Sequence, residues 1–374
     1  MDSVGILIAG GGPAGSSCAW ALRQAGLDPL ILDKRVFPRD KICGGWITPA
    51  VLDALKIDPA DYSRSRIFQP ISGFRTSSMG RKEIETQYGG PISFGIRRFE
   101  FDEYLLRRSH ARVKEGIALK SIERSGDDWI VNGEYKARVV VGAGGHFCPV
   151  ARFLNSDVEK NPAVVAQELE FQMDTRQRDS CSIRADVPEL FFCDDMQGYG
   201  WCFRKDNFLN IGLGRLDSHG LPGHVAAFAR FLRTTGKIGF DLPPSFPGHA
   251  YLLHAHIRRR VVSDGILLVG DAAGLAYSQS GEGIRPAVES GLLAARTIIS
   301  AGGRSDRHSL ETYPLALESR FGESGEDWST RIGRRLPPPV RNGLAGALLT
   351  SRWFSRHFVL DRWFLHRQER ALEV

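Results

Sequence analysis

The stretch KICGGWIT, residues 41–48, places one cysteine directly before two glycines and a tryptophan. A free thiol is mostly protonated at neutral pH, so Cys43 could donate a proton to a bound molecule. Gly44 and Gly45 would let the backbone approach a flat ligand without a side-chain clash. Buried packing is the alternative for Cys43, because cysteine is often a small core residue. We therefore predict a catalytic Cys43 at a ligand, with packing as the competing interpretation.

The residues before this stretch have the pattern of a dinucleotide-binding unit. An apolar strand from Ile6 ends at glycines spaced G-x-G-x-x-G, a helical pattern follows, and a second apolar strand ends at Asp33. The first glycine permits a tight turn, the second lets the backbone approach a pyrophosphate at the helix N-terminus, and the third allows close helix–strand packing. The acidic residue can bind ribose hydroxyls. The predicted cofactor contacts here are Gly10, Gly12, Pro13, Ala14, Gly15, Asp33, Lys34 and Arg35.

The pattern predicts one tightly bound dinucleotide rather than two. The stretch VVVGAGG, residues 139–145, has strand-like glycines but lacks a third glycine at the required spacing. The sequence therefore does not predict a second dinucleotide unit of the same kind.

The composition is that of an ordinary globular protein of 374 residues, with 42% hydrophobic and 25% charged side chains. We expect no targeting segment, because the first apolar run leads directly into the glycines. No apolar run approaches the roughly 20 residues of a membrane span. The six cysteines show no spacing typical of zinc ligands, so we expect reduced thiols, no metal site and a cytoplasmic location.

Several stretches, in order along the chain, resemble the geranylgeranyl reductase type of FAD-dependent oxidoreductases. That family is related more distantly to aromatic hydroxylases and flavin-dependent halogenases. The stretches are GGGPAGSSCAWAL with LDKR, FPRDKICGG, GIRRFEFDEYLLRRS, ARVVVGAGG, GYGWCFRK and GILLVGDAAGLAYSQSGEGIRPAVESGLLAA, and they span residues 1 to about 300. The resemblance implies that the cofactor is FAD and that the K-x-C-G-G stretch passes along the isoalloxazine face. Cys43 would then donate a proton, tune the flavin or shape the pocket.

The last of these stretches indicates the flavin end of the site. Its strand ILLVG ends at Gly270 and Asp271, at the edge where open α/β sheets bind ligands. The resemblance implies that Asp271 binds a ribityl hydroxyl of FAD, with a helix N-cap as the alternative. The following SGEGI opens a helix whose N-terminal charge of roughly +0.5 would favour negative charge on a reduced flavin. The predicted contacts here are Gly270, Asp271, Gly281, Gly283 and Ile284.

Two further cofactor contacts follow from the resemblance. One of Arg97 and Arg98 is expected near FAD, since guanidinium groups bind phosphate and carbonyl oxygens well, and we choose Arg97. The strand-like GIALKSIE places Leu119 near the adenine.

The residues from about 162 to 254 have the alternating pattern of antiparallel strands. We predict an α/β fold with a Rossmann-like FAD-binding domain (1–70, 95–160 and 255–300), an inserted antiparallel β-sheet domain for the substrate (71–94 and 161–254) and a C-terminal helical region (301–374). In GYGWCFRK, alternate aromatic residues share one face of a strand, where they could line a pocket or belong to the core. The predicted substrate pocket comprises Trp46, Tyr199, Trp201, Phe203 and Tyr277.

The C-terminal region is basic and aromatic. Residues 331–374 hold nine arginines and three acidic residues. The formal charge of this region is therefore +6, which equals the net charge of the whole chain. A helical layer packed on the body is one interpretation. The other is peripheral contact with a membrane surface, where aromatic rings lie at headgroup level and arginines meet anionic lipid. Nucleic acid is not expected as a partner, because the arginines belong to no known nucleic-acid-binding motif.

Together these features predict an FAD-dependent reductase. The resemblance implies hydride transfer from reduced flavin N5 to a carbon–carbon double bond of an apolar isoprenoid or polyene substrate, with NAD(P)H, ferredoxin or a flavin reductase as the external electron donor. A flavin monooxygenase is the alternative, but the chain has Gly144 where the hydroxylases have an aspartate associated with NADPH handling. A halogenase is a lesser alternative, because Tyr199 replaces the first of that family's two tryptophans.

Overall fold

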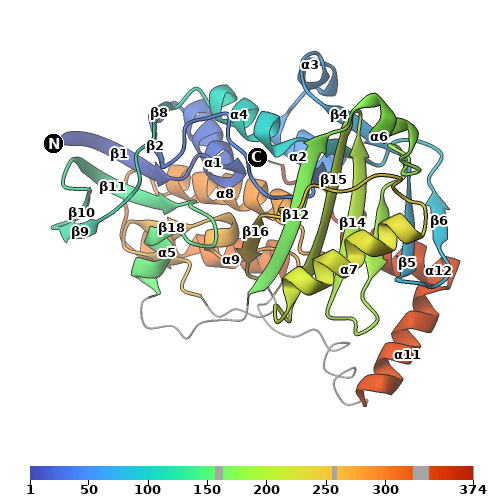
Figure 1. Cartoon of the computed structure of the whole chain (residues 1–374). Helices are drawn as coiled ribbons and strands as arrows, with labels where there is room; N and C mark the ends of the chain where they lie inside the picture. Colours follow the sequence, from blue (N-terminus) through green and yellow to red (C-terminus); the bar gives the residue numbers. More distant parts are fainter. Residues whose placement is uncertain (156–162, 255–258, 323–336, 374) are drawn as a thin grey trace.

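The structure, a computed structural model, describes residues 1–155, 163–254, 259–322 and 337–373. Its strands form sheets of eight, seven and three strands. The two larger sheets occupy opposite halves of the molecule, and the helices α1 and α8 lie in the half that holds the N-terminus (Figure 1). This arrangement matches the predicted α/β class with an inserted, largely antiparallel sheet.

The eight-stranded sheet contains the N-terminal unit. Its central strands β18, β11, β1, β2 and β8 are parallel neighbours, and β9 and β10 form an antiparallel extension beside β11. The inner strands are almost continuously apolar because both faces are covered. The strands are β1 (Asp2–Ala9), β2 (Leu30–Asp33), β8 (Arg112–Glu115), β9 (Ile122–Ser125), β10 (Asp128–Val131), β11 (Tyr135–Gly142), β17 (Val262–Ser263) and β18 (Ile266–Leu268).

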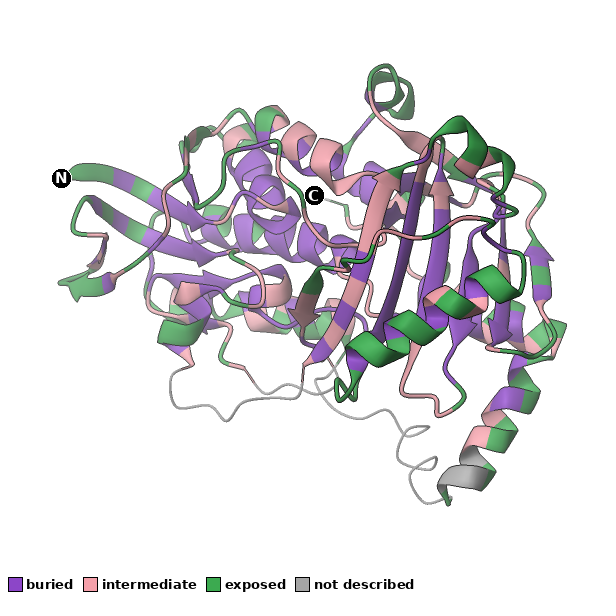
Figure 2. Cartoon of the chain, in the orientation of Figure 1, coloured by how far each residue is buried: buried purple, intermediate pink, exposed green. Residues whose placement is uncertain are grey.

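Two helices pack against each other beside this sheet. Helix α1 (Pro13–Gln24) begins with proline, whose fixed φ suits a first helical position. Helix α8 (Ile284–Ser300) is buried along most of its length (Figure 2). The two backbones approach closely because a Cβ at Gly291 would overlap the carbonyl of Ala14. Along the chain, α4 (Arg98–Arg108) and α5 (Pro149–Leu154) come between strands of this sheet, and α9 (Thr312–Phe321) follows α8.

The seven-stranded sheet has two different faces. Period-2 alternation turns Cys202, Ile211 and Leu213 towards helix α7 (Leu221–Thr234), where they form a core with Phe228. The opposite face carries the aromatic side chains of β14 and faces the interior of the molecule. All neighbouring strands are antiparallel except β5 and β13. The strands are β5 (Gly73–Ser78), β6 (Ile84–Gln87), β12 (Val164–Gln172), β13 (Glu189–Phe192), β14 (Gly198–Lys205), β15 (Phe208–Arg215) and β16 (Gly248–Tyr251).

A small sheet of β3 (Trp46–Ile47), β4 (Phe68–Ile71) and β7 (Ser93–Ile96) carries two segments that matter for the site. The loop 41–45 runs directly into β3, and β7 runs directly into α4. Pairing of β3 with β7 therefore fixes the KICGG stretch beside the two arginines that open α4. Short α-helices of the described chain also include α2 (Pro49–Leu55), α3 (Pro59–Ser63) and α6 (Thr175–Asp179), and η3 (His308–Leu310) is a short 3-10 helix.

The C-terminal region packs on the inner face of the second sheet. Helix α11 (Pro338–Leu349) and the short α12 (Arg352–Phe354) lead into a π-helical segment, Ser355–Phe364. Val359, Leu360 and Phe364 belong to the same core as Trp46 and Trp201. Residues 365–373 continue without regular structure, and residues 323–336 of the predicted helical region lie outside the described residues.

The predicted domain boundaries stay a prediction. Every strand of the seven-stranded sheet lies within 71–94 or 161–254, and every strand of the eight-stranded sheet lies within 1–70, 95–160 or 255–300. Within the described residues, no helix is both long and apolar enough to cross a bilayer. The same part of the chain holds no group of three His, Cys, Asp or Glu residues placed to bind a metal ion.

Candidate active site

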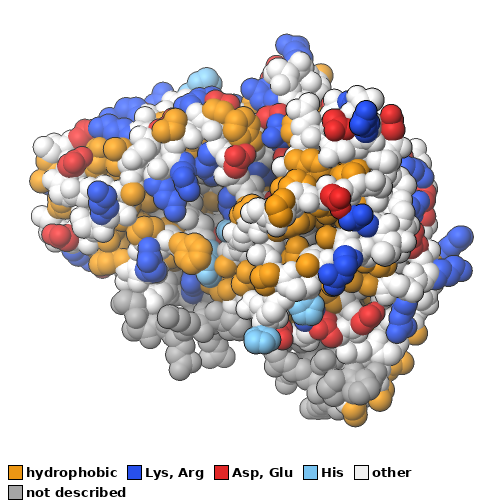
Figure 3. Space-filling model, viewed as in Figure 1, with side chains coloured by type: hydrophobic (Ala, Val, Ile, Leu, Met, Phe, Trp, Pro, Cys, Tyr) orange, Lys and Arg blue, Asp and Glu red, His pale blue; other side chains and the backbone are white. Residues whose placement is uncertain are grey.

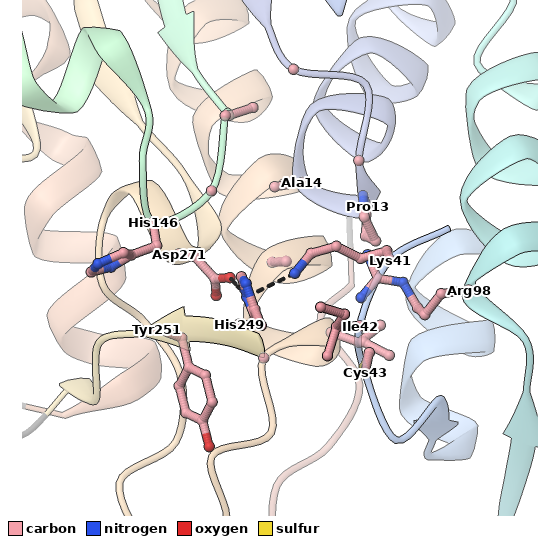
Figure 4. Close-up of a pocket in the computed structure, with 18 of the residues that line it drawn as sticks. Pro13, Ala14, Lys41, Ile42, Cys43, Arg98, His146, His249, Tyr251 and Asp271 are labelled. Carbon is pink, nitrogen blue, oxygen red and sulfur yellow. Dashed lines mark hydrogen bonds and ion pairs between the residues drawn. The ribbon is translucent and has the colours of Figure 1, made fainter. Parts of the chain in front are cut away.

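A single cavity of about 680 Å³ joins the dinucleotide unit to the aromatic face of the second sheet. This volume is within the ordinary range for small-molecule sites, roughly 300–1,000 Å³. At one end the cavity is lined by the turn after β1 and by the end of β2. At the other it is lined by the loop 41–45, by β12 and β14, and by Phe364. Figure 4 shows side chains from both ends facing the same space.

The dinucleotide end has the geometry that its motif requires. Gly10 has φ +121°, and a Cβ there would overlap the carbonyl of Ala143. A Cβ at Gly15 would likewise overlap the Gly10 carbonyl, so Gly15 acts through helix–strand packing and does not line the cavity. Asp33 is oriented by the Gly11 amide, which donates to its Oδ2 at 2.7 Å, and by the Arg35 amide, which donates to Oδ1 at 2.8 Å.

Arg39 lies at the N-terminus of α1 and was not predicted from the sequence. One guanidinium nitrogen, Nη2, is 3.0 Å from Asp102, and the same nitrogen would lie 3.5 Å from a Cβ at Gly12. Its Nη1 is buried and has no hydrogen-bond partner within the described residues. A half-buried cation with one buried, unpaired donor, beside a helix N-terminus, fits an anionic group such as a pyrophosphate.

The structure corrects the choice between the two neighbouring arginines. Arg98, not Arg97, lines the cavity. Arg98 Nε and Nη2 donate to the two oxygens of Asp102, at 2.6 and 2.8 Å. Arg97 turns away, donates to Glu170 at 3.0 Å and lies over the ring of Phe208. Successive residues at a strand–helix junction point in different directions. Arg98 is the one that pairs with the buried carboxylate of Asp102, one turn further along α4.

The backbone of Cys43 is held on both sides by the second sheet. Its amide donates to Oε1 of Glu168 on β12, and its carbonyl accepts from Nδ2 of Asn210 on β15 at 3.3 Å. The Cys43 thiol is close enough to Arg98 to interact with its guanidinium (Figure 4). Gly45 has φ +63°, and a side chain there would meet the carbonyl of Ile96. The KICGG stretch therefore forms part of the cavity wall with its backbone fixed.

The aromatic wall of the cavity combines side chains from separate elements. Tyr199, Trp201 and Phe203 lie on one face of β14, as their alternation predicts, and all three line the cavity. Trp201 lies across β15 above Gly212, where a Cβ would overlap its ring, and its Nε1 donates to Asn210 Oδ1 at 2.7 Å. Other rings in this wall are those of Trp46, Tyr251 and Phe364.

Tyr277 does not belong to this wall. Its ring stacks on His366 with centroids 3.6 Å apart, and its hydroxyl donates to Glu369 at 3.1 Å. The loop after η2 (Gly270–Ala272) turns Tyr277 towards the C-terminal segment and away from the cavity. Phe364, from that C-terminal segment, occupies the aromatic wall where Tyr277 was expected.

Between the two ends lies a group of charged side chains. Lys41 Nζ is 2.7 Å from His249 Nε2, which is 3.8 Å from Asp271 Oδ2 (Figure 4). Burial, together with the charge of Arg98, lowers the pKa of Lys41 to about 8. Burial also lowers the pKa of His249. For Asp271 burial acts to raise the pKa, but the His249 hydrogen bond and the Lys41 charge outweigh it, so the pKa lies below its ordinary value.

The N-terminus of α8 opens onto the same space. A Cβ at Gly283 would lie 3.2 Å from Asp271 Oδ1, and a side chain at Gly281, which has φ +68°, would overlap the Tyr251 hydroxyl. Glu282 accepts the Arg285 amide at 2.7 Å, and burial raises the pKa of Glu282. The two glycines therefore let Tyr251 and Asp271 pack closely against the N-terminus of α8, whose first residue, Ile284, lines the cavity.

Most of the predicted site residues line the one cavity, while their individual roles stay predictions. Those at the cavity are Gly10, Gly12, Pro13, Ala14, Asp33, Lys34, Arg35, Cys43, Gly44, Gly45, Trp46, Leu119, Tyr199, Trp201, Phe203, Asp271, Gly281, Gly283 and Ile284. Those away from it are Gly15, Arg97, Gly270 and Tyr277. Residues at the cavity that sequence reasoning missed include Arg39, Arg98, Glu168, His249, Tyr251, Glu282 and Phe364. Of these, Arg39, Arg98 and Glu282 had a signal, since all three belong to stretches already assigned to the cofactor.

Comparison with known proteins supports this picture. Residues 8–74 match the family described as the NAD(P)-binding Rossmann-like domain. The chain is 30% identical to menaquinone reductase of Mycobacterium tuberculosis over 348 residues, 86% of this chain and 81% of that protein. It is 28% identical to digeranylgeranylglycerophospholipid reductase 3 of Methanosphaera stadtmanae, over 86% of this chain and 84% of that protein.

A solved structure has the same fold over nearly the whole chain. It is the geranylgeranyl bacteriochlorophyll reductase-like protein of Thermoplasma acidophilum, with a TM-score of 0.77, 20% sequence identity and 98% of both chains covered. The identity to named reductases over most of both chains, the shared fold and the dinucleotide unit at the cavity lead to one assignment. The chain belongs to the geranylgeranyl reductase family of FAD-dependent oxidoreductases.

Proposed function

We propose that this protein binds FAD in the cavity and reduces a carbon–carbon double bond of an apolar isoprenoid substrate. The observation that carries the proposal is the continuity of the cavity, which runs from the dinucleotide unit to a wall of aromatic side chains. The names of the relatives, which specify menaquinone and geranylgeranyl compounds, support an isoprenoid as the substrate class. Bound FAD, once reduced, would supply hydride from N5.

The residues at the dinucleotide end fit FAD. The Gly12 turn, the N-terminus of α1 and the free donor of Arg39 would hold the pyrophosphate, and Asp33 would accept hydrogen bonds from a ribose. Asp271 would bind the ribityl chain. The open N-terminus of α8 would favour negative charge on the flavin ring, with a helix-terminal charge of roughly +0.5.

The aromatic wall would bind the substrate and exclude water. Trp46 and Trp201 line the cavity and are each 8% exposed, and their rings contact those of Phe203 and Tyr199, respectively. Asn210 holds the indole of Trp201, which orients that ring and satisfies its buried N–H. A fixed apolar wall would hold an alkene in one orientation, which contributes to rate by positioning.

Reduction of the bound flavin requires an external donor, which we propose to be NAD(P)H, ferredoxin or a flavin reductase. Stopped-flow mixing of the oxidised holoenzyme with each donor, without oxygen, distinguishes them by the rate at which the absorbance of oxidised flavin is lost.

The reductase proposal is tested by single turnover without oxygen. The photoreduced holoenzyme is mixed with a lipid that carries geranylgeranyl chains, and we expect the absorbance of oxidised flavin to return while mass spectrometry shows two added hydrogens per turnover. Product formation that needs dioxygen and adds an oxygen atom would replace this proposal with a monooxygenase.

We also propose peripheral membrane contact through α11. This helix extends from the body (Figure 1), and its exposed apolar side chains Val340, Leu344 and Leu348 repeat every four residues. Trp353 is 63% exposed, and exposed arginines lie on either side of it along the chain, at 352 and 356. Elsewhere on the face shown in Figure 3, acidic and basic side chains are interspersed. An apolar stripe flanked by cations suits a surface of anionic lipid.

Sedimentation with vesicles tests this contact. Binding to vesicles with phosphatidylglycerol should exceed binding to phosphatidylcholine vesicles, and Leu344→Glu with Leu348→Glu should abolish it. Equal binding by the variant would exclude α11 as the contact. A cytoplasmic location is proposed separately, because all six cysteines are unpaired thiols.

A further inference from the structure

Glu168 is a buried carboxyl group on the substrate side of the cavity. It lies on β12, on the face that also presents Ala166 to the cavity, and it is 4% exposed. Its Cβ lies close to Gly212, beside the ring of Trp201. Oε1 accepts the amide of Cys43. Within the described residues Oε2 has no hydrogen-bond partner, so it is available to carry a proton.

The surroundings of Glu168 favour the protonated acid. Burial is the main effect and raises the pKa of Glu168 to about 7, against an ordinary value of 4.5. The Cys43 amide and the charges of Lys205 and Lys41 act in the opposite direction, while the negative charge of Glu170 adds to the increase. The titratable and charged groups that face Glu168 are Lys41 and Cys43 of the loop, Lys205 of β14, Glu170 of β12, and His249 and Tyr251 of β16.

Glu170, two residues further along the same strand, has a pKa that is shifted in the opposite direction. Lys205 donates to it at 2.7 Å and Arg97 at 3.0 Å. Burial acts to raise its pKa, but these two cations outweigh burial and the pKa of Glu170 lies below its ordinary value. Glu170 is therefore an ionised partner of two cations, away from the cavity, whereas Glu168 is a cavity carboxyl group able to hold a proton.

We propose that Glu168 is the acid that protonates the substrate carbon during double-bond reduction. This inference rests on the proposed function, which supplies the alkene and the reductant. One alkene carbon receives a hydride, two electrons with a proton, from the reduced flavin. The electron pair of the π bond forms the second carbon–hydrogen bond with the Glu168 proton, the O–H bond breaks, and a carboxylate remains. Water then returns a proton to Glu168, and the external donor restores the reduced flavin.

Glu168→Gln separates this role from a structural one. Glutamine keeps an oxygen that accepts the Cys43 amide, so the loop 41–45 stays anchored, but it has no acidic proton. We expect the variant to bind FAD and to lose about 10²- to 10⁴-fold in the single-turnover rate of alkene reduction, the usual contribution of a general acid. The wild-type rate should fall as pH rises through about 7, because the carboxyl group ionises there, and the variant should lack this decrease.

Glu170→Gln is the matched control. It should keep the decrease in rate with pH but move it to lower pH, because loss of the Glu170 charge removes an effect that raises the pKa of Glu168. A second measurement does not depend on turnover. Infrared difference spectra of the cofactor-free protein should show a carbonyl band of a protonated carboxyl group that disappears between about pH 6 and 8, and Glu168→Gln should remove this band.

The outcomes separate this inference from the proposed function. If wild-type protein reduces no alkene, the proposed function fails, and the catalytic role of Glu168 fails with it. If wild-type protein reduces the alkene and Glu168→Gln does so within about twofold, only the role of Glu168 is overturned. Absence of the titrating infrared band in wild-type protein would also overturn it.

Discussion

The position of Trp201 depends on the absence of a side chain at Gly212. The indole lies across β15, and a Cβ at Gly212 would overlap the ring and come within 2.7 Å of the Glu168 Cβ. Gly212→Ala should therefore force Trp201 to rotate and break the buried hydrogen bond from its Nε1 to Asn210. The same change should push the indole into the space proposed for the substrate.

The cost of Gly212→Ala can be worked from three contributions. Overpacking of a well-packed interior costs about 1–3 kcal/mol. Loss of a buried hydrogen bond that leaves a polar group unsatisfied costs about 1–3 kcal/mol more. Replacing glycine by alanine restricts the unfolded chain and returns about 0.4–1 kcal/mol. We expect a net decrease of about 3 kcal/mol in the free energy of unfolding.

Gly214→Ala is the control, because it lies two residues along the same face of β15. A Cβ at Gly214 would meet no atom closer than 3.5 Å, so alanine fits there without displacing Trp201. Urea unfolding followed by tryptophan fluorescence should give a lower midpoint for Gly212→Ala and an unchanged or slightly higher midpoint for Gly214→Ala. Equal stability of the two variants would refute the packing argument for Trp201.

Three other expectations concern residues of the cavity wall. Arg98→Lys should weaken FAD binding, measured by fluorescence titration of the cofactor-free protein, whereas Arg97→Lys should leave the dissociation constant nearly unchanged, because only Arg98 lines the cavity. The pKa of Glu168 is about 7 in the folded protein and 4.5 ordinarily, so its contribution to stability is fully present below about pH 4.5 and is lost as pH rises through about 7. The free energy of unfolding of wild-type protein should therefore fall by about 3 kcal/mol over this range because of this group, and Glu168→Gln should lack that fall. Urea unfolding at several pH values measures the difference. Phe364→Ala should lower the free energy of unfolding by about 3–5 kcal/mol, since Phe364 is buried against Trp46, and calorimetry of both proteins measures the difference.

The sequence was most informative where the site is local along the chain. The turn, the helix and the acidic residue of the dinucleotide unit all lie between residues 6 and 35, so their spacing is enough to predict their geometry. The face shared by Tyr199 and Trp201 followed from period-2 alternation within a single strand. These features need no knowledge of how distant segments pair.

The residues that were missed or misplaced depend on contacts between distant segments. Glu168 meets Cys43 across 125 positions, and nothing in the spacing of either residue indicates the pairing of β12 with that loop. The choice of Arg98 depends on the buried carboxylate of Asp102, whose burial is a property of the folded protein. Tyr277 was misplaced because the C-terminal segment, which supplies its partner His366, packs beside the loop that carries it.

The anchoring of Cys43 by its backbone makes the role of its thiol testable. The Cys43 amide and carbonyl hold the loop to Glu168 and Asn210, so a change of side chain should leave the loop in place. Cys43→Ser then compares a thiol with a hydroxyl at fixed geometry. If Glu168 supplies the proton, Cys43→Ser should bind FAD and keep most of the single-turnover rate, with an unchanged decrease in rate above about pH 7. A large loss of rate in Cys43→Ser, with FAD still bound and the pH dependence gone, would instead make the thiol the acid and leave Glu168 as an anchor of the loop.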